Sequence, residues 1–562
     1  MLGSDSLRSG NEKNSASGSE ASSKKPRFVF VVGGVLSGLG KGVVTASIAK
    51  LIKDSGYKVT AIKIDPYVNV DAGTMRPTEH GEVFVTEDGG EIDQDLGTYE
   101  RFLDVFLSKR HNITTGQIYL SVINRERALG YGGRDVEIIP DVVEEVKNRI
   151  MEVAKDYDVT VVEVGGTTGD IENLVFLHAV RQLMNEHPSV SIMVSYVPLL
   201  RNVGELKTKP TQHAVAKLRE VGIFPDFIVA RSETGLDEPR IWKISRSCFV
   251  KKENIIDDPD LKCIYELPLL FEKQGFISKI LNMLGLEDRE RNLEDWEKMV
   301  NVMVNSDKSV RIGIVGKYVT IGNAEHKDVY ISVIEAVKHA AAKFGYKAEV
   351  KQISSQDLEK GNLEVLNDFD GIIVPGGFGE TGVEGKINAI RYCRENGIPF
   401  LGLCFGMQLA VVEFARNVCG MKEAHTTEIN PETPYPVVDI IPEQKELLKQ
   451  RKYGATMRLG SWPAVLKKGT KVFELYGKEN VEERHRHRYE VNPKYIEELE
   501  KHGLVFSGKS PDGKLMEFLE IPDHPFFVAT QAHPEFKSRP LRPHPLFVGL
   551  VNAAIKRREN RE

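Results

Sequence analysis

The sequence predicts an α/β protein with two doubly wound domains, each built on a mainly parallel sheet. Residues 27–32 are apolar and β-rich, glycines follow, residues 41–54 have a helical pattern, and residues 58–64 form a second apolar run. Strand, glycine turn, helix and strand in this order are typical of the βαβ unit of a parallel sheet. A polar stretch near residue 305 precedes a second set of apolar runs, and 562 residues exceed what one hydrophobic core normally supports.

Composition narrows the class of protein. The net charge of -6 is small for this length, and acidic and basic residues are interspersed, so we expect no nucleic-acid partner. No apolar run reaches the length of a membrane span, and the N-terminus lacks the apolar core of a signal peptide, so we expect no membrane partner. The five cysteines form no CxxC pair, which fits a reducing compartment. We therefore expect a cytoplasmic protein that acts on small molecules.

Changes in composition divide the chain into four segments. Residues 1–26 are rich in Ser, Gly, Asn, Glu and Lys and predict a disordered tail. Residues 27–290 are expected to form the first domain, residues 291–309 a linker helix and linker, and residues 310–562 the second domain. Further strands are expected at residues 159–164, 191–197, 227–230, 310–316 and 371–377.

The glycine-rich stretch at residues 33–42 lies between the first strand and the first helix. Backbone N–H groups and a helix N-terminus at this position can hold phosphate groups. One extra residue precedes Gly40-Lys41 relative to the usual GxxxxGK[ST] spacing, and Gly42 stands where a magnesium-binding Ser or Thr is usual. A purely structural glycine turn is the alternative. If a nucleotide binds here, its metal needs carboxylates from elsewhere.

Four carboxylates are candidates for that metal. Glu91, Asp93 and Asp95 alternate, so in an extended segment they point to one side, and Glu163 ends a strand just before two glycines. Asp95 with Glu163 suffices for Mg²⁺, which commonly takes one or two carboxylates and completes its shell with water and phosphate oxygens. A solvated acidic turn is the alternative for Glu91. Lys63, at the end of the second strand, could add positive charge to a transferring phosphoryl group.

A second anion site is suggested by residues 204–212. Lys207 and Lys209 lie two residues apart in a loop that precedes a helix, where they could cradle a triphosphate. A solvated surface is the alternative, since lysine pairs are common on protein exteriors. Lys243 and the acidic loop at residues 170–172 are weak signals when taken one at a time.

Cys404 is expected on a tight turn between the apolar run at residues 398–401 and a helix that begins near residue 407. Such a turn exposes its central side chain, and the helix N-terminus favours the thiolate. His533 and Glu535, two residues apart after an apolar strand, can supply a base and the carboxylate that orients it. The alternative is a free cysteine used for packing.

Two further features belong to this second candidate site. The N–H groups of Gly376-Gly377, at the end of a neighbouring strand, and of Phe405 could stabilise a developing oxyanion. The run at residues 483–489 looks like a basic surface or nucleic-acid patch, but it is too short and isolated to favour that interpretation. One arginine that clamps a carboxylate is a sufficient role for it.

Taken together, these motifs resemble those of the CTP synthase family. Residues 402–408 and His533-Pro534-Glu535, with residues 374–379 and 486–492, are similar to a class I glutamine amidotransferase. Residues 33–42, 63–67, 80–85 and 207–212 are similar to the synthetase domain of that family. The resemblance runs from about residue 27 to about residue 556 and implies a P-loop-type amidoligase domain followed by a class I glutaminase.

The resemblance implies a reaction and its partners. ATP would phosphorylate the 4-oxygen of UTP, ammonia from glutamine would displace that phosphate, and CTP, ADP, phosphate and glutamate would be released. It also implies Mg²⁺ with ATP, feedback inhibition by CTP at the UTP triphosphate site, GTP as a candidate allosteric activator, and a homotetramer that can form filaments.

The resemblance also assigns residues to each role. The catalytic residues would be Cys404, His533 and Glu535, and Mg²⁺ would be held by Asp95 and Glu163. ATP would contact Ser37, Gly38, Leu39, Gly40, Lys41, Gly42, Val43, Lys63, Asp95, Pro259, Asp260 and Leu261. UTP or CTP would contact Ser37, Asp170, Ile171, Glu172, Lys207, Thr208, Lys209, Pro210, Thr211, Gln212 and Lys243. Glutamine would contact Gly377, Phe405, Gly406, Met407, Gln408, Glu428 and Arg488.

The chain departs from the family pattern at three places. Glu380-Thr381 stands where the family usually has Arg in the segment after Gly-Gly-Phe-Gly, Asp141 stands where it usually has His, and the N-terminal tail has no counterpart in shorter members. Two rival functions are a ligase that amidates corrin-ring carboxylates and a nucleotide-binding scaffold without catalysis. The segment at residues 207–212 argues against the first, because a corrin needs no triphosphate cradle, and the full set of candidate catalytic residues argues against the second.

Overall fold

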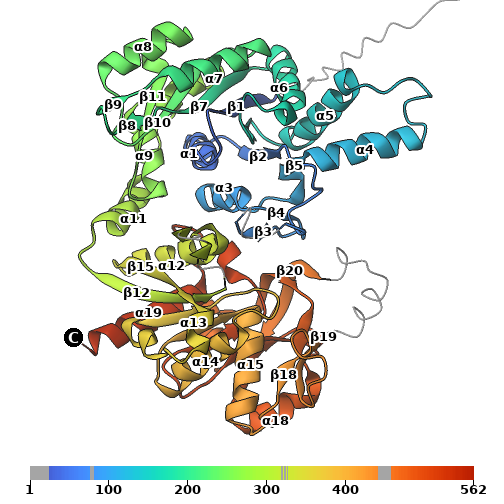
Figure 1. The fold of residues 1–562 in the computed structure, drawn as a ribbon, viewed down its shortest axis with the longest axis vertical. Helices are drawn as coiled ribbons and strands as arrows, with labels where there is room; N and C mark the ends of the chain where they lie inside the picture. Colours follow the sequence, from blue (N-terminus) through green and yellow to red (C-terminus); the bar gives the residue numbers. More distant parts are fainter. Residues whose placement is uncertain are drawn as a thin grey trace, which may run out of the picture.

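The computed structural model describes residues 25–75, 81–317, 320–321, 324–325, 327–440 and 457–561. The expected tail lies almost wholly outside this range, as does His80 of the 80–85 motif. An N-terminal half and a C-terminal half lie one above the other, and helix α11 (Glu294–Asn305) leads from the first into the second (Figure 1). This helix lies within residues 291–309, the segment expected to hold a linker helix and linker.

In the N-terminal half, the described residues form a seven-stranded parallel sheet in the order β11-β10-β7-β1-β6-β2-β5. Its strands carry near-continuous apolar runs because helices cover both faces, as is usual for parallel sheets. The strands are β1 (Arg27–Gly34), β2 (Val59–Asp65), β5 (Asn112–Thr114), β6 (Val159–Val164), β7 (Ser189–Tyr196), β10 (Phe227–Ser232) and β11 (Ile255–Pro259). All five strands expected in this half are present, and the expected first helix is α1 (Lys41–Asp54).

In the C-terminal half, the described residues form a nine-stranded mixed sheet in the order β15-β12-β16-β17-β25-β24-β23-β20-β21. The first five strands are parallel, as expected, whereas the remaining pairs are antiparallel. The strands are β12 (Ser309–Gly316), β15 (Lys347–Ser354), β16 (Gly371–Val374), β17 (Phe400–Leu403), β20 (Arg458–Leu466), β21 (Asn480–His487), β23 (Val505–Lys509), β24 (Met516–Glu520) and β25 (Phe527–Thr530). The antiparallel part was not anticipated, because its strands carry charged residues that hide their pattern.

Helices pack on both faces of the two sheets, as a doubly wound fold requires. Those of the N-terminal half are α3 (Asp95–Leu103), α4 (Thr115–Arg127), α5 (Val143–Ala154), α6 (Leu174–Glu186), α7 (Lys209–Glu220), α8 (Glu238–Cys248), α9 (Leu267–Lys273) and α10 (Phe276–Met283). Those of the C-terminal half are α12 (Ile331–Lys343), α13 (Ser355–Glu359), α14 (Val383–Glu395), α15 (Phe405–Asn417), α17 (Lys471–Tyr476), α18 (Ile496–Lys501) and α19 (Pro545–Glu559). Helix α3 and the hairpin of β3 (Val83–Val85) and β4 (Glu91–Asp93) face the C-terminal half (Figure 1).

A buried charge cluster joins the two halves. Glu100 on α3 accepts hydrogen bonds from Arg484 at 2.9 Å and Arg539 at 2.6 Å. Glu100 and Arg484 are 0% exposed and Arg539 is 1% exposed. Arg484 also donates to Glu87 at 3.0 Å, on the loop between β3 and β4. The basic run at residues 483–489 is therefore not a surface patch, because Arg484 and Arg486 pair with carboxylates of the other half.

Replacing Glu100 by alanine should strongly destabilise the protein. Removing one partner from a buried ion cluster leaves the others uncompensated, so we expect a loss of about 3 kcal/mol or more in the free energy of unfolding. Urea denaturation measures this change. The matched control is Arg542→Ala, which breaks the interdomain pair of Arg542 with Asp104, where both side chains are largely exposed. It should cost at most about 1 kcal/mol, and equal effects of the two variants would contradict the role given to burial.

Candidate functional site

The glycine-rich loop ends β1 and leads into α1, as expected. Gly38 and Gly40 have φ of 75° and 83°, a region that favours glycine. Lys41 folds back across the loop and donates to the carbonyl oxygen of Gly166 at 2.9 Å. A Cβ on Gly33 would lie only 2.6 Å from Lys41 Nζ, so that glycine makes room for the lysine. The loop thus combines a cation with a helix N-terminus, which together suit a phosphate group.

The structure explains why glycine occupies position 42. A Cβ at Gly42 would lie 2.4 Å from Oδ1 of Asp95. The carboxylate of α3 therefore fills the space where a Ser or Thr hydroxyl usually points in this type of loop. Only a residue without a side chain at position 42 leaves room for Asp95 at the start of α1.

Asp95 and Glu163, the carboxylates expected to hold Mg²⁺, both contact Lys63. The Lys63 ammonium group contacts Asp95, and it lies 2.7 Å from Glu163 and 3.9 Å from Asp65. Burial opposes its charge, but the surrounding carboxylates of Asp95, Glu163 and Asp65 raise the pKa of Lys63 well above its usual value. An ammonium group held between two carboxylates shows that this position suits a cation. The side chains present therefore fit Mg²⁺.

Glu91 does not belong to this carboxylate group. It pairs with Arg486 of the C-terminal half at 2.8 Å, because β4 ends at Asp93 and the alternation does not continue to Asp95 on α3. No group of three or more His, Cys, Asp or Glu side chains in the described part of the chain is arranged as a metal site. A metal here would thus use few protein ligands, as Mg²⁺ commonly does.

The candidate UTP segment lies against the phosphate loop. A Cβ on Gly34 would lie 2.6 Å from Cβ of Ala214, which shows how closely α7 approaches the end of β1. Thr168 ties the two together, since its N–H donates to Gly33 and its hydroxyl donates to Ala214. Residues 207–212 are therefore held at the carboxyl edge of the sheet, where ligands of this fold bind.

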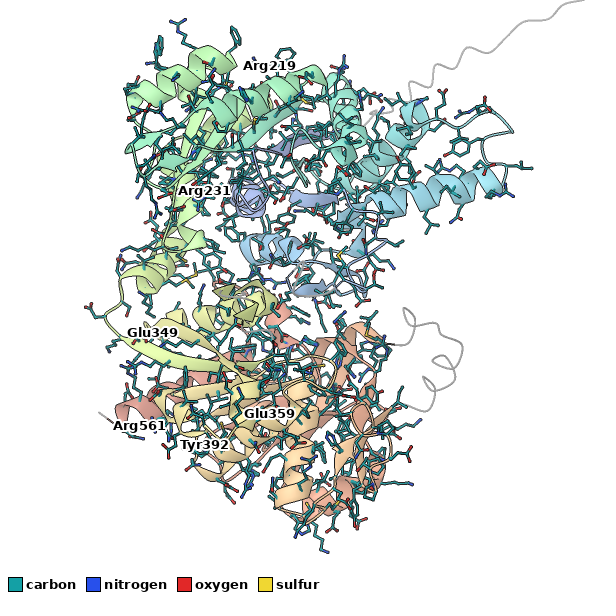
Figure 2. The ribbon with its side chains drawn as sticks, viewed as in Figure 1. Arg219, Arg231, Glu349, Glu359, Tyr392 and Arg561 are labelled. Carbon is teal, nitrogen blue, oxygen red and sulfur yellow. The ribbon has the colours of Figure 1, made fainter. Side chains whose placement is uncertain are left out.

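Several other residues assigned to ATP or UTP lie farther from the phosphate loop. Lys243 is exposed on α8, and Lys207 pairs with Glu205 at 2.7 Å. Pro259 ends β11, which is separated from β1 by β10 and β7. Asp260 pairs with Arg231 at 2.9 Å, and Arg231 lies at the left side of the N-terminal half in the view of Figure 2. The residues assigned to ATP thus spread along the sheet edge rather than forming one compact cluster.

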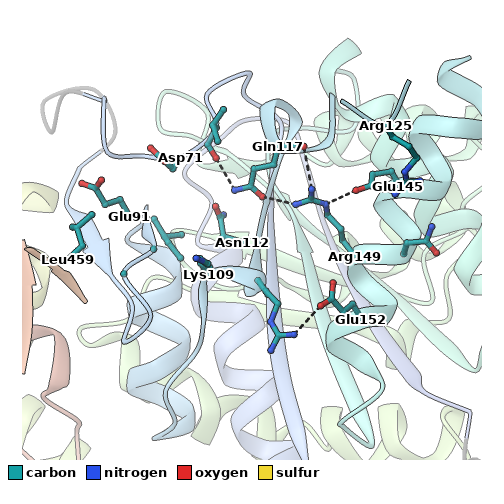
Figure 3. A pocket seen from close by; sticks show the side chains of 16 residues that line it. Asp71, Glu91, Lys109, Asn112, Gln117, Arg125, Glu145, Arg149, Glu152 and Leu459 are labelled. Atoms are coloured by element: carbon teal, nitrogen blue, oxygen red, sulfur yellow. Dashed lines mark hydrogen bonds and ion pairs between the residues drawn. The ribbon is translucent and has the colours of Figure 1, made fainter. Parts of the chain in front are cut away.

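A cavity of about 650 Å³ opens at the β5 edge of the first sheet (Figure 3). Its charged lining is largely paired internally, with Arg149 and Arg125 both on Glu145 and Arg110 on Glu152. Because these arginines already have carboxylate partners, the cavity has little free positive charge for a triphosphate. We do not place a substrate there.

Cys404 lies on the predicted strand-to-helix turn, between β17 and α15. Its backbone has φ 50° and ψ -103°, a strained conformation for a residue with a Cβ. The turn is tight because a Cβ on Gly406 would lie 2.0 Å from the carbonyl oxygen of Val374. The expected exposure is wrong, since Cys404 is only 2% exposed. Its side chain lines a cavity whose walls come from both halves of the chain.

His533 and Glu535 complete the predicted triad. His533 Nδ1 lies 2.7 Å from Oε1 of Glu535, and His533 lines the same cavity as Cys404. Burial opposes its positive charge, but Glu535 and Cys404 raise the pKa of His533 to about 10. The imidazolium form is therefore stable at neutral pH. This arrangement suits an activated thiol nucleophile.

The cavity beside Cys404 is shared by both halves of the chain. It has a volume of about 280 Å³. Gly376, Cys404 and His533 line it from the C-terminal half, and Glu82 and Val83 line it from the N-terminal half. A small molecule released at Cys404 would therefore enter a space whose far wall belongs to the phosphate-loop half.

The residues assigned to glutamine lie around α15. Gln408 donates to the carbonyl oxygen of Tyr489 at 3.0 Å, and its buried Oε1 has no hydrogen-bond partner among the described residues. Glu428 accepts from the N–H of Gly379 at 3.1 Å. An unpaired buried acceptor and a carboxylate near Cys404 fit an amino-acid ligand that carries an ammonium group.

Two lysines near Cys404 were missed by the sequence analysis. Lys317 and Lys386 lie 5.3 and 5.6 Å from the ring centre of Phe405, and Lys386 is 0% exposed. Burial, with a contribution from Lys317, lowers the pKa of Lys386 to about 7. The sequence did not indicate a role for Lys386, because its burial within α14 depends on residues that are distant in the chain.

Two of the positions that depart from the family pattern, Asp141 and the pair Glu380-Thr381, lie in different surroundings. Asp141 accepts hydrogen bonds from Arg134 and from the N–H of Glu137, both at 2.9 Å, so it stabilises the loop before α5. Glu380 and Thr381 are exposed. Separately, no helix in the described residues is long and apolar enough to cross a membrane.

A Cys-His-Glu triad on one α/β half and a phosphate loop with paired carboxylates on the other define a glutamine-dependent ligase. Residues 27–286 match the family CTP synthase N-terminus, and residues 325–553 match glutamine amidotransferase class-I. The CTP synthase of Pyrococcus abyssi is 55% identical over 540 residues, which cover 95% of this chain and 99% of that protein. The CTP synthase of Methanocaldococcus jannaschii is 53% identical over 539 residues, covering 94% and 98%. The chain belongs to the CTP synthase family.

Replacing Glu535 by glutamine should reduce the reactivity of Cys404 at neutral pH. Without the carboxylate, the pKa of His533 falls, the imidazolium no longer stabilises the thiolate, and each unit of change is worth about tenfold. We expect alkylation of Cys404 by iodoacetamide at pH 7 to slow by about 10-fold or more. The measurement is the alkylation rate across a pH series.

The four other cysteines serve as internal controls for this experiment. Burial raises the pKa of the thiols of Cys248, Cys263, Cys393 and Cys419, so they should react slowly in both proteins. Unchanged alkylation of Cys404 in the Glu535→Gln variant would contradict the electrostatic role of Glu535.

Proposed function

We propose that this chain converts UTP to CTP, using ATP and the ammonia released from glutamine, and that it divides the reaction between two sites. The observation that carries the division is the cavity beside Cys404, since both halves contribute to its walls. Family membership supports the overall reaction. An assay with UTP, ATP, Mg²⁺ and glutamine tests it, and failure to form CTP would overturn it.

At the glutaminase site, Cys404 Sγ attacks the side-chain carbonyl of glutamine. N–H groups of Gly377 and Phe405 would stabilise the resulting oxyanion. As the C–N bond breaks, His533 gives its proton to the leaving nitrogen and ammonia is released. Water, deprotonated by His533, then cleaves the thioester to give glutamate. Glu535 keeps the imidazole oriented throughout.

Glutamine itself would be held by the remaining assigned residues. Gln408 and Glu428 offer acceptors to its α-ammonium group, and Arg488 would pair with its carboxylate. Gly406 and Met407 would contact it through the first turn of α15. The unpaired Oε1 of Gln408 supports this arrangement.

At the synthetase site, residues Ser37 to Val43 would hold the phosphates of ATP, with Lys41 adding positive charge. Asp95 and Glu163 would hold Mg²⁺, which supplies charge neutralisation to the transferring phosphoryl group. With Mg²⁺ held by the two carboxylates, the Lys63 ammonium group would contact phosphate instead. Pro259 to Leu261 would contact the adenine end of ATP.

UTP would lie on the adjacent segment. Lys207 to Gln212 and Lys243 would bind its triphosphate, and ammonia arriving from Cys404 would displace the phosphate on its 4-oxygen. CTP would share the triphosphate cradle and use Asp170 to Glu172 for its cytosine, which supports feedback inhibition by competition. We also propose a homotetramer able to form filaments, and a cytoplasmic location, in agreement with the free cysteines.

GTP is proposed as an activator of glutamine-dependent synthesis. The exposed Glu380-Thr381 pair lacks the arginine that the family usually has there. Comparing the glutamine-dependent rate with and without GTP tests this assignment directly.

Replacing Cys404 by alanine should abolish glutamine-dependent CTP formation and leave synthesis from added ammonium. The thiol is needed only to make ammonia, whereas the phosphate loop uses it. The matched contrast is Lys41→Ala, which should lose both syntheses while it retains glutamine hydrolysis. Loss of ammonium-dependent synthesis in a folded Cys404→Ala protein would contradict the two-site division.

Replacing Gly42 by alanine should weaken the use of Mg²⁺ and ATP without loss of the glutaminase. The added Cβ collides with Asp95 and must displace it. Displacing a metal-holding carboxylate should cost about 10-fold or more in metal affinity. The Mg²⁺ dependence of ammonium-driven CTP synthesis measures this effect, with glutamine hydrolysis as the control. An unchanged Mg²⁺ dependence would show that Asp95 does not hold the metal.

A further inference from the structure

Glu82 lies on the wall of the cavity that contains Cys404, although it belongs to the other half of the chain. It immediately precedes β3, and its side chain is largely buried. No role in substrate binding or in the triad has been given to it above. It nevertheless lies on a wall of the space that ammonia released at Cys404 would enter.

The Glu82 carboxyl group connects the two walls of this cavity. It accepts hydrogen bonds from the backbone N–H of Ser332 at 3.2 Å and from the Ser332 hydroxyl. Ser332 is in the first turn of α12, where N–H groups have no partner within the helix. Val329, Tyr330 and Val333, around the start of α12, also line the cavity. Glu82 therefore caps a helix of the opposite half and attaches it to β3.

A second contact strengthens the same attachment. Arg101 of α3 donates to the Ser332 hydroxyl at 3.2 Å, so two side chains of the N-terminal half converge on one serine. The start of α12 is thus held from two directions. The cavity wall formed by α12 depends on these contacts rather than on packing alone.

The charge of Glu82 is also suited to a passage for ammonia. Burial raises the pKa of Glu82 to about 8, with Glu535 adding to the rise and Ser332 and Arg101 opposing it. His533, whose pKa is raised to about 10, lines the same cavity, so a positively charged imidazole lies near this carboxyl group. At neutral pH the carboxyl group is mostly uncharged, so it does not stabilise ammonium. Neutral ammonia is the form that can attack the activated nucleotide.

We propose that Glu82 is a positioning residue for ammonia transfer, which fastens the start of α12 to β3 and keeps ammonia from Cys404 inside the cavity. This inference rests on the proposed function, because it requires that Cys404 release ammonia and that the other half consume it. It adds to that function a residue that determines where the ammonia goes.

The test is an isotope competition with the full-length enzyme. Glutamine with a heavy-nitrogen amide is supplied together with unlabelled ammonium, and the labelled fraction of the CTP is measured by mass spectrometry. Confined ammonia has a high effective concentration at the second site, so the intact protein should give mainly labelled CTP. Glu82→Ala should lower the labelled fraction at least about two-fold, because opening the wall lets ammonia exchange with solvent.

Two variants separate transfer from general stability. Glu82→Gln keeps an uncharged acceptor of the same shape and should retain most of the labelled fraction. Arg542→Ala breaks an interdomain ion pair on the exposed rim and should leave the labelled fraction unchanged. If Glu82→Ala does not fold, Ser332→Ala removes the hydroxyl partner and should lower the labelled fraction in its place.

The outcomes are distinguishable. A Glu82→Ala enzyme that makes CTP with the labelled fraction of the intact protein would overturn the proposal, as would equal losses in Glu82→Ala and Arg542→Ala. Rates of glutamine hydrolysis and of ammonium-dependent synthesis should stay close to those of the intact protein in Glu82→Ala. If the intact protein itself forms no labelled CTP, the proposed function fails, and that result differs from the failure of this inference.

Discussion

The buried contact of Glu100 with Arg484 and Arg539 is the constraint on which the rest of the arrangement depends. Glu100 belongs to α3, the helix that begins with the metal candidate Asp95. Arg484 belongs to β21, and its carbonyl oxygen accepts a hydrogen bond from the N–H of His533 at 2.7 Å. One ion cluster therefore fixes the helix that begins with Asp95 relative to His533. Two active sites built on separate sheets acquire a defined mutual position through it.

Lys63 and Lys386, one buried lysine from each site, have pKa values shifted in opposite directions. Lys63 is surrounded by carboxylates that keep it charged, which suits chemistry on phosphate groups. Lys386 lies next to the ring of Phe405 and has a pKa of about 7, so much of it is neutral at physiological pH. A permanent strong cation behind Cys404 would compete with His533 for the thiolate. The environment of each lysine thus matches the charge that its own site can tolerate.

Much of the fold and the site followed from local sequence signals. The helix at residues 41–54, the turn at Cys404 and the His533-Glu535 pair were predictable, because each depends on neighbours in the chain. The arginines at residues 484 and 486 were harder, since their carboxylate partners lie almost 400 positions away. The use of Gly42 to admit Asp95 could only be seen once α3 was placed beside α1.

At the phosphate loop, the carboxylate of Asp95 fills the space of the usual Ser or Thr hydroxyl, and this affects how the helices of the N-terminal half are connected. In the usual loop, the metal ligand and the phosphate-binding groups belong to one helix. Here Asp95 lies on α3 and Glu163 on β6, whereas the phosphate loop leads into α1, so a cation held by the two carboxylates would tie α3 to the sheet of the N-terminal half. Because α3 also carries Glu100, the helix beside the phosphate loop is the same helix that joins the two halves.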